Sequence, residues 1–274
     1  MSPSFEDLVS EAATVPVEGW DFSWLGGRAT EERPSWGYQE LLARRLPQAT
    51  AALDVQTGGG EVLAGALTGT RTGTGPAVRP VPARRPAVLA ATESWAPNVA
   101  VATALLHPLG AVVVADEDEP PLPFADSAFD LVTSRHPVTV QWEEIARVLR
   151  PGGTYLSQQV GPASVFELVE YFLGPQPAAR RARDPEEARR GARAAGLEVV
   201  DLRAERLRME FHDVGAVVYF LRKVIWMVPG FTPERERDRL RRLHEQITAE
   251  GPFVAHSSRF LIEARKPDAA RPSR

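Results

Sequence analysis

The sequence predicts an α/β fold in which a mostly parallel β-sheet is covered by helices on both faces. Short apolar runs typical of strands alternate with helical segments between residues 51 and 160. Such alternation favours parallel strands joined by crossover helices. With 274 residues, of which 43% are hydrophobic and 25% charged, the chain can form one large domain that carries additional elements.

The expected elements follow from the apolar periodicity and from the Gly and Pro residues that interrupt it. In the core we expect strands at 51–55, 87–91, 111–115, 129–133 and 154–160, and helices at 61–67, 97–107 and 142–149. Beyond residue 161 we expect a helix at 165–172, a charged helical run at 180–193, a strand at 197–206, helices at 212–227 and 233–250, and a strand pair or hairpin at 253–264.

Composition excludes several classes of protein. The chain has no Cys, which excludes a disulfide framework, a thiolate metal site and a cysteine nucleophile. The net charge of −4 disfavours nucleic-acid binding. The longest apolar stretch, 214–228, is interrupted by Arg222 and Lys223, and no signal peptide is evident. We therefore expect a cytoplasmic protein that does not bind a membrane.

A glycine-rich turn follows the first expected strand and precedes a helix. Residues 53–61 read LDVQTGGGE, with Asp54, Gln56, Gly58 and Gly60 at alternate positions. Glycines let the backbone turn sharply near a ligand, and the helix N-terminus offers unpaired N–H groups. No Lys-Ser or Lys-Thr pair follows, which disfavours a nucleotide P-loop. Alone, this run is also compatible with a plain loop.

An acidic residue, Glu93, stands at the end of the second expected strand. A carboxylate in this position binds ribose hydroxyls in doubly wound folds. The alternative is that Glu93 is only a charge at the start of the helix that contains Pro97.

Two further motifs complete an ordered set. Residues 122–132 read LPFADSAFDLV before the fourth strand, and residues 144–153 read EIARVLRPGG before the fifth. Together with the glycine-rich turn and Glu93, these segments resemble class I S-adenosylmethionine-dependent methyltransferases over roughly residues 50–161. The resemblance implies a Rossmann-like fold with a mostly parallel seven-stranded sheet, S-adenosyl-L-methionine as cofactor and S-adenosyl-L-homocysteine as product.

The resemblance also implies roles for individual residues. By the methionine end of the cofactor it places Asp54, Gln56, Thr57, Gly58 and Gly60. It implies that Glu93 binds the ribose, that Ser94 and Trp95 pack near the adenosine, and that Asp116 or Glu117 approaches the adenine amine. Facing the transferred methyl it places Ser134, Arg135 and His136.

His136 and Arg135 are the candidate catalytic residues. A general base is needed only if the acceptor must lose a proton, and His136 is the leading candidate because it follows a central strand. The alternative is a histidine that hydrogen-bonds the loop. Gln56 departs from the family, which usually has Gly there, so its side chain could crowd the cofactor or hydrogen-bond it.

Aromatic and polar residues outside the motifs are candidates for a lid or an acceptor pocket. For the lid these are Trp20, Trp24, Trp36 and Tyr38. For the pocket they are Tyr219, Arg222 and Trp226, at i, i+3 and i+7 of a helix, together with the polar His212 and His256. Ordinary packing is an equal alternative for the aromatic residues, and a structural role is favoured for the two histidines. No metal site is expected.

The resulting domain scheme has three parts. An N-terminal aromatic segment spans 1–46, a methyltransferase domain spans 47–266, and a disordered tail spans 267–274. Within the domain we expect a flexible insertion at 68–86 and cap or substrate elements at 162–196 and 207–252.

The expected function is methyl transfer to oxygen, nitrogen or carbon of a small molecule, as in bacterial secondary metabolism, by a monomer or homodimer. Three alternatives stay open. One is an RNA methyltransferase, which the basic insertion 68–86 favours and the acidic composition opposes. Another is a protein that binds the cofactor without methylating, which Gln56 favours. The last is an enzyme that uses the cofactor for another reaction.

Overall fold

A computed structural model describes residues 3–19, 22–70 and 84–268, and the chain divides into two compact units. Unit 1 comprises Met1–Arg33, Gly161–Ala182 and Glu205–Arg259; unit 2 comprises Pro34–Val160, Arg183–Ala204 and Phe260–Arg274. Most of the expected insertion at 68–86 and of the expected tail at 267–274 lies outside the described residues. Among the residues described, no helix is both long and apolar enough to span a membrane.

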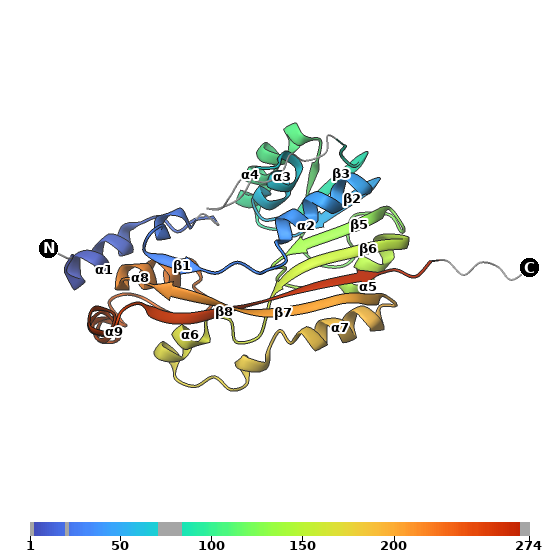
Figure 1. Ribbon diagram of the computed structural model, residues 1–274. Coiled ribbons are helices and arrows are strands. Elements are labelled where there is room, and N and C mark those ends of the chain that lie inside the picture. The colour runs from blue at the N-terminus through green and yellow to red at the C-terminus, as the bar shows by residue number, and fades with distance from the viewer. Residues whose placement is uncertain (1–2, 20–21, 71–83, 269–274) are drawn as a thin grey trace, which may run out of the picture. The chain divides into compact units, whose positions relative to one another are not determined.

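Unit 2 is built on five parallel strands. They are β2 (Ala51–Val55), β3 (Val88–Glu93), β4 (Val112–Ala115), β5 (Phe129–Arg135) and β6 (Leu149–Val160). Their spatial order is β6-β5-β2-β3-β4, so β2 is central and pairs with β5 on one side and β3 on the other (Figure 1). Every residue of β2 is buried, as a strand covered on both faces requires.

Helices cover both faces of this sheet. One face carries α2 (Tyr38–Arg45), α3 (Glu61–Thr68) and α4 (Ala96–Leu106), whose side chains join those of β2, β3 and β5 in one apolar core. The other carries α5 (Trp142–Val148) and α7 (Pro185–Ala194), which contribute to a second core with the opposite side chains of the same strands. The predicted doubly wound α/β fold is confirmed.

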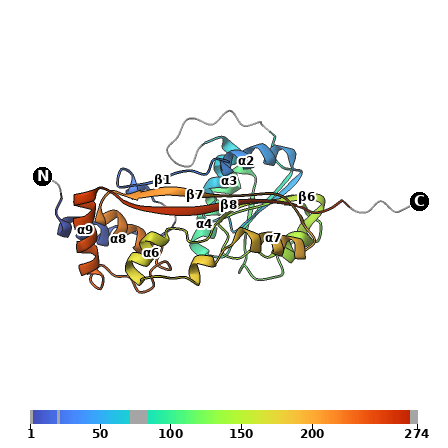
Figure 2. The same cartoon turned by 60° about the horizontal axis from the view of Figure 1, so that its bottom comes forward.

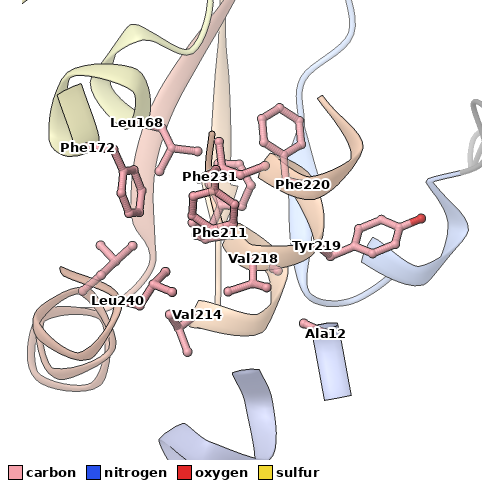
Figure 3. Close-up of a cluster of buried hydrophobic side chains, with 14 of the residues drawn as sticks. Ala12, Leu168, Phe172, Phe211, Val214, Val218, Tyr219, Phe220, Phe231 and Leu240 are labelled. Carbon is pink, nitrogen blue, oxygen red and sulfur yellow. The ribbon is translucent and has the colours of Figure 1, made fainter. Parts of the chain in front are cut away.

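Unit 1 has a separate apolar core. Its helices are α1 (Phe5–Thr14), α6 (Phe166–Leu173), α8 (Val214–Lys223) and α9 (Arg237–Glu250). Its core gathers Phe211, Val218, Phe231 and Leu240, all at most 6% exposed (Figure 3). Helix α1 begins with a capping box, in which Ser4 Oγ accepts from the Asp7 N–H and Asp7 Oδ2 accepts from the Ser4 N–H.

The described residues form one sheet of eight strands rather than seven, in the order β1-β7-β8-β6-β5-β2-β3-β4. The unexpected strand is β1 (Ala29–Glu31), which pairs antiparallel with β7 (Glu198–Phe211). The expected strand pair at 253–264 is instead one long strand, β8 (Phe253–Arg265), which lies beside β7 (Figures 1 and 2).

The helix expected at 212–227 is shorter than the apolar pattern indicated. Asp213 Oδ1 accepts from the Ala216 N–H and fixes the start of α8 at Val214. Val224 leaves helical geometry with φ −111° and ψ 54°, so the helix ends at Lys223. Trp226, expected on the same face as Tyr219, therefore lies beyond the helix.

An ion pair on α5 explains why the motifs at 122–132 and 144–153 occur together. Arg147 binds Glu144 and also donates to the Leu122 and Phe124 carbonyl oxygens at 2.9 and 2.7 Å. Glu144 in turn accepts from the Leu122 N–H at 2.7 Å, and its pKa is lowered, first by the Arg147 hydrogen bond. The pair thus holds the segment that leads into β5 against the helix that leads into β6.

Replacing Arg147 tests this role. We expect Arg147→Ala to lower the free energy of unfolding by about 2–4 kcal/mol, because several charge-assisted hydrogen bonds are lost together. The free energy of unfolding of Arg147→Lys should lie between those of the wild type and Arg147→Ala, since an ammonium keeps the charge but not the planar arrangement of donors. Denaturant unfolding of the three proteins provides the measurement. Equal losses of stability for Arg147→Ala and Arg147→Lys, or no loss for either, would contradict this structural role of Arg147.

Candidate functional site

The candidate site lies where three parallel strands end. In the register of the sheet Asp54 of β2 pairs with Ala91 of β3 and with Thr133 of β5, so the residues that follow these strands converge at one edge. This edge is also where the chain order reverses around β2, the position at which doubly wound folds bind ligands.

The glycine-rich turn after β2 depends on left-handed backbone conformations. Gly58 and Gly60 have φ of 65° and 83°, and a Cβ on Gly60 would lie 2.9 Å from the Leu106 side chain. Gln56 adopts φ 56° without the freedom of glycine. For a residue with a side chain, this conformation costs roughly 1–2 kcal/mol.

The Gln56 side chain ties the turn to the loop that follows β5. Its Oε1 accepts from the Val138 N–H at 2.7 Å, and its Nε2 donates to the Thr139 carbonyl oxygen at 2.9 Å. The cavity lined by Gln56, Ser134 and Tyr155 encloses about 10 Å³, the space of about one water molecule. In this arrangement the turn and the loop are closed on each other.

Glu93 is buried and fixed by the same turn. Its Oε2 accepts from the Gly58 N–H at 2.8 Å, and its Oε1 accepts from the Trp95 N–H at 3.0 Å. Trp95 is the N-cap residue of α4, and its side chain is exposed. The carboxylate predicted to bind ribose thus lies beside the glycines.

Asp54 faces the interior of the sheet. Its two carboxylate oxygens accept from the Thr57 and Thr133 hydroxyls at 2.7 and 2.6 Å. Burial raises the pKa of Asp54 from 3.8 to about 6, and the two hydroxyl hydrogen bonds oppose that shift. Asp54 and Thr57 therefore brace the turn, and both oxygens of Asp54 are already engaged.

Three buried acceptor oxygens close to Glu93 have no hydrogen-bond partner among the described residues. They are Asp116 Oδ2, Asp118 Oδ1 and Gln141 Oε1. The Asp116 N–H donates to the Glu93 carbonyl oxygen at 3.0 Å, and Gln141 Nε2 donates to the Asp118 carbonyl oxygen. Burial raises the pKa of Asp116 and of Asp118, whose carboxylate also hydrogen-bonds Ser94. These three oxygens are therefore buried hydrogen-bond acceptors without a donor among the described residues.

Asp118 and Gln141 were not expected in the site. Asp118 belongs to the acidic run 116–119, and acidic side chains are ordinarily exposed on the surface. Gln141 carries no sequence signal, because its place here depends on the path of the loop after β5. The sequence does not single out Asp118 either, because four acidic residues in a row give no indication of which side chain points inward.

His136 is held by a chain of hydrogen bonds from Trp36 through Gln158. Trp36 Nε1 donates to Gln158 Oε1 at 2.8 Å, and Gln158 Nε2 lies 3.0 Å from His136 Nε2. The indole can only donate, so the Gln158 oxygen must face Trp36 and its NH₂ must donate to the imidazole. Nε2 of His136 is therefore an acceptor, and the proton of the neutral ring is on Nδ1. Arg135, the last residue of β5, lies opposite Gln158 in the sheet.

Ser134 belongs to a buried hydroxyl network. Its Oγ lies 2.8 Å from the Tyr155 hydroxyl and 2.9 Å from Ser157 Oγ, and its carbonyl oxygen accepts from the Tyr38 hydroxyl at 2.8 Å. Burial raises the pKa of Tyr155 to about 12 and that of Tyr38 well above its usual value. Ser134 and Tyr38 stabilise the strand ends and are 1% and 5% exposed.

Of the expected lid residues, Trp36 and Tyr38 are buried inside unit 2, and Trp24 belongs to unit 1. The Trp24 ring lies 4.9 Å from that of Tyr219 and 4.1 Å from the Arg28 guanidinium. Trp24 thus makes ordinary packing contacts, the alternative to a lid that the sequence left open for the aromatic residues. Trp20 lies outside the described residues.

The polar residues expected near the acceptor also have structural partners within unit 1. Arg222 donates to the Ala12 and Val15 carbonyl oxygens at the end of α1. His256 Nδ1 lies 2.9 Å from Glu167, and the His212 ring lies 3.9 Å from Glu210. Trp226 is 57% exposed.

Comparison with known proteins shows which family model and which solved structures this chain resembles. Residues 71–157 match the family of methyltransferase domains, and no curated protein sequence matches the chain. A solved structure from Bacillus halodurans, named as a candidate methyltransferase, is 20% identical with a TM-score of 0.55, covering 84% of this chain and 98% of its own. The YcgJ protein from Bacillus subtilis is 18% identical with a TM-score of 0.56, covering 85% and 99%.

The chain has a Rossmann-like methyltransferase fold. A further solved structure, that of the [4+2]-cyclase SpnF, is 18% identical with a TM-score of 0.50, and the match covers 98% of each chain. At these identities the likeness concerns the fold.

The site of this methyltransferase fold matches the adenosine part of S-adenosylmethionine in its chemistry. The ribose hydroxyls and the adenine amine are donors, and Glu93 with the unpaired oxygens of Asp116, Asp118 and Gln141 supplies acceptors. Where the resemblance would put the methionine end of that cofactor, the Gln56 side chain closes the turn and the loop on each other.

The raised pKa of Asp54 predicts a pH-dependent stability. The folded protein binds this proton more tightly than the unfolded chain, so the contribution is present at low pH and is lost as pH rises from 3.8 to about 6. Asp54→Asn does not titrate and keeps one acceptor and one donor for the two threonines. The free energy of unfolding of Asp54→Asn minus that of the wild type should therefore rise by up to about 3 kcal/mol across this interval and then level off.

Unfolding by urea at closely spaced pH values checks this prediction. The variant Asp238→Asn, at an exposed position on α9, is the control and should follow the wild type throughout. A difference for Asp54→Asn that is constant or falls with pH would contradict the assignment.

The hydrogen-bond chain predicts the tautomer of His136. In ¹⁵N NMR spectra of the imidazole, we expect the proton on Nδ1 and a bare Nε2. Trp36→Phe removes the donor that orients the Gln158 amide, so the two tautomers should become mixed. Trp142→Phe, outside the chain, should leave the His136 signals unchanged. A wild-type spectrum with the proton on Nε2 would overturn the proposed orientation.

Proposed function

We propose that this protein transfers a methyl group from S-adenosyl-L-methionine to a small molecule. The observation that carries the proposal is the group of acceptors at the carboxyl edge, where Glu93 meets the glycine-rich turn and where Asp116, Asp118 and Gln141 have unpaired oxygens. Glu93 and Asp116 suit the ribose and the adenine amine, respectively. The turn 56–60 would lie by the methionine end.

The cofactor, when bound, supplies a methyl group already activated by its sulfonium. The protein then has to hold the two reactants in line and exclude water, which accounts for much of the acceleration in such reactions. His136 is suited to orienting rather than to removing a proton at Nε2, because that nitrogen already accepts from Gln158. Proton removal there requires the Gln158 bond to open first.

The acceptor in this proposal is a small molecule rather than RNA. A net charge of −4 leaves no overall electrostatic attraction to a polyanion, and phosphate contacts supply most of the affinity in nucleic-acid binding. Salt-dependent RNA binding by the purified protein would reverse this preference.

A second candidate function is cofactor binding without methyl transfer. Its support is the Gln56 side chain, which joins the turn to the loop where the methionine end would lie. The neighbour named as a [4+2]-cyclase also illustrates that this fold is used for a reaction other than methyl transfer. In that case both S-adenosylmethionine and S-adenosylhomocysteine bind, and no methylated product forms with any acceptor tested.

Calorimetry with S-adenosylmethionine and S-adenosylhomocysteine tests the proposed site. We expect both to bind, and Glu93→Gln to weaken them by about 1–3 kcal/mol, roughly 5- to 150-fold, because charge-assisted hydrogen bonds to the ribose are weakened. Glu119→Gln changes an exposed carboxylate of the neighbouring acidic run and should leave the affinity unchanged. Absence of binding by the wild type rejects the proposal; unchanged affinity of Glu93→Gln removes Glu93 from the site.

A further inference from the structure

The loop that joins β5 to α5 is fixed at its two ends. The His136 N–H donates to the Gln158 carbonyl oxygen at 2.7 Å, and the Gln141 carbonyl oxygen accepts from the Ile145 N–H of α5 at 2.9 Å. The residues between these ends, 137–140, belong to no helix or strand. A movement of the loop that keeps both ends in place must therefore occur within 137–140.

The Gln56 side chain holds the middle of this loop. In the part of the chain that the structure describes, its bonds to the Val138 N–H and the Thr139 carbonyl oxygen are the only hydrogen bonds that residues 137–140 make. Both residues are exposed, Val138 by 84%. Exposed segments with few contacts open at a low cost in free energy. The two bonds of Gln56 thus act as a latch on the loop 137–140.

The space between the turn and the loop is too small for an amino-acid group while this latch is closed. The cavity there, lined by Gln56 and by Pro137 and Thr139 of the loop, encloses about 10 Å³, the space of about one water molecule. The proposed function puts the amino-acid end of S-adenosylmethionine beside this turn. A ligand with that end must therefore displace the loop, whereas a ligand that ends at the ribose need not.

We propose that Gln56 determines which adenosine-type ligands this site takes. Ligands with an amino-acid end bind only after both Gln56 hydrogen bonds break, and ligands without it bind while the loop is closed. The inference rests on the proposed function for the position of the ligand, and it goes further by assigning the discrimination to one side chain. Two hydrogen bonds of ordinary strength favour the closed loop about 30-fold, and the affinity for a ligand of the open loop falls by the same factor.

Hydrogen exchange of the Val138 N–H tests the latch without any ligand. This group donates to Gln56 Oε1, so its exchange with water requires the latch to open. In NMR spectra of the ¹⁵N-labelled full chain, we expect exchange to be about 5- to 30-fold slower in the wild type than in Gln56→Ala, the factors for one and two lost hydrogen bonds. Alanine keeps a Cβ, so the cost of the left-handed backbone is retained.

Gln48→Ala is the matched control. It removes an exposed amide of the same unit that donates to the Arg44 carbonyl oxygen, and Val138 should exchange in it at the wild-type rate. Equal exchange rates of Val138 in the wild type and in Gln56→Ala would overturn the latch.

Calorimetry with S-adenosylhomocysteine and adenosine tests the discrimination. We expect Gln56→Ala to bind S-adenosylhomocysteine about 30-fold more tightly than the wild type does, because closure of the loop no longer competes with the ligand. The affinity for adenosine should be the same in both proteins, and Gln48→Ala should match the wild type with both ligands. An equal gain for the two ligands would overturn the assignment to Gln56.

The outcomes separate this inference from the proposed function. Binding of S-adenosylhomocysteine by the wild type, with no gain in Gln56→Ala, overturns the discrimination and leaves the proposed function standing. Binding by Gln56→Ala alone rejects the function proposed for the wild type and supports the latch. Absence of binding by both proteins rejects the proposed function and the discrimination together.

Discussion

The candidate site depends on the pairing of β2 with two parallel neighbours. Because β3 and β5 both run alongside β2, the backbone must turn away at the same edge of the sheet three times. The side chains that follow the strands are then crowded together, and polar groups among them must find partners or remain unpaired. Asp54, Thr57 and Thr133 satisfy one another inside the sheet, whereas Asp116, Asp118 and Gln141 keep unpaired oxygens.

The sequence predicts the parts of the structure that depend on local patterns. Strands β2 to β6 follow from short apolar runs with Gly or Pro at their ends, and the Glu144–Arg147 pair accounts for the spacing of two motifs. These signals are local because a buried parallel strand is apolar throughout, whatever its neighbours are. The fold class could therefore be predicted correctly while the details beyond residue 161 were only partly so.

The features that the sequence does not predict depend on contacts between residues that are distant in the chain. Trp36 and Tyr38 stand among polar residues, and such a pattern suits an aromatic lid as well as a core; only their hydrogen bonds to Gln158 and Ser134 decide between these. The role of Gln158 arises from the register of β6 against β5, which no local pattern specifies. Likewise, the cap at Asp213 sets where α8 begins, so an apolar stripe that continues to Trp226 overstates its length.

Gln56 sets an energetic threshold for any ligand that needs the turn and the following loop apart. Its left-handed backbone costs roughly 1–2 kcal/mol, and its two side-chain hydrogen bonds return about 1 kcal/mol each, so the closed arrangement is close to balance. A ligand that opens the loop while the Gln56 backbone stays left-handed must break both bonds, at a cost of about 2 kcal/mol, which lowers its apparent affinity by about 30-fold. A deficit of this size is smaller than the gain from pairing several buried acceptors, so we expect Gln56 to weaken the proposed cofactor binding at this edge without preventing it.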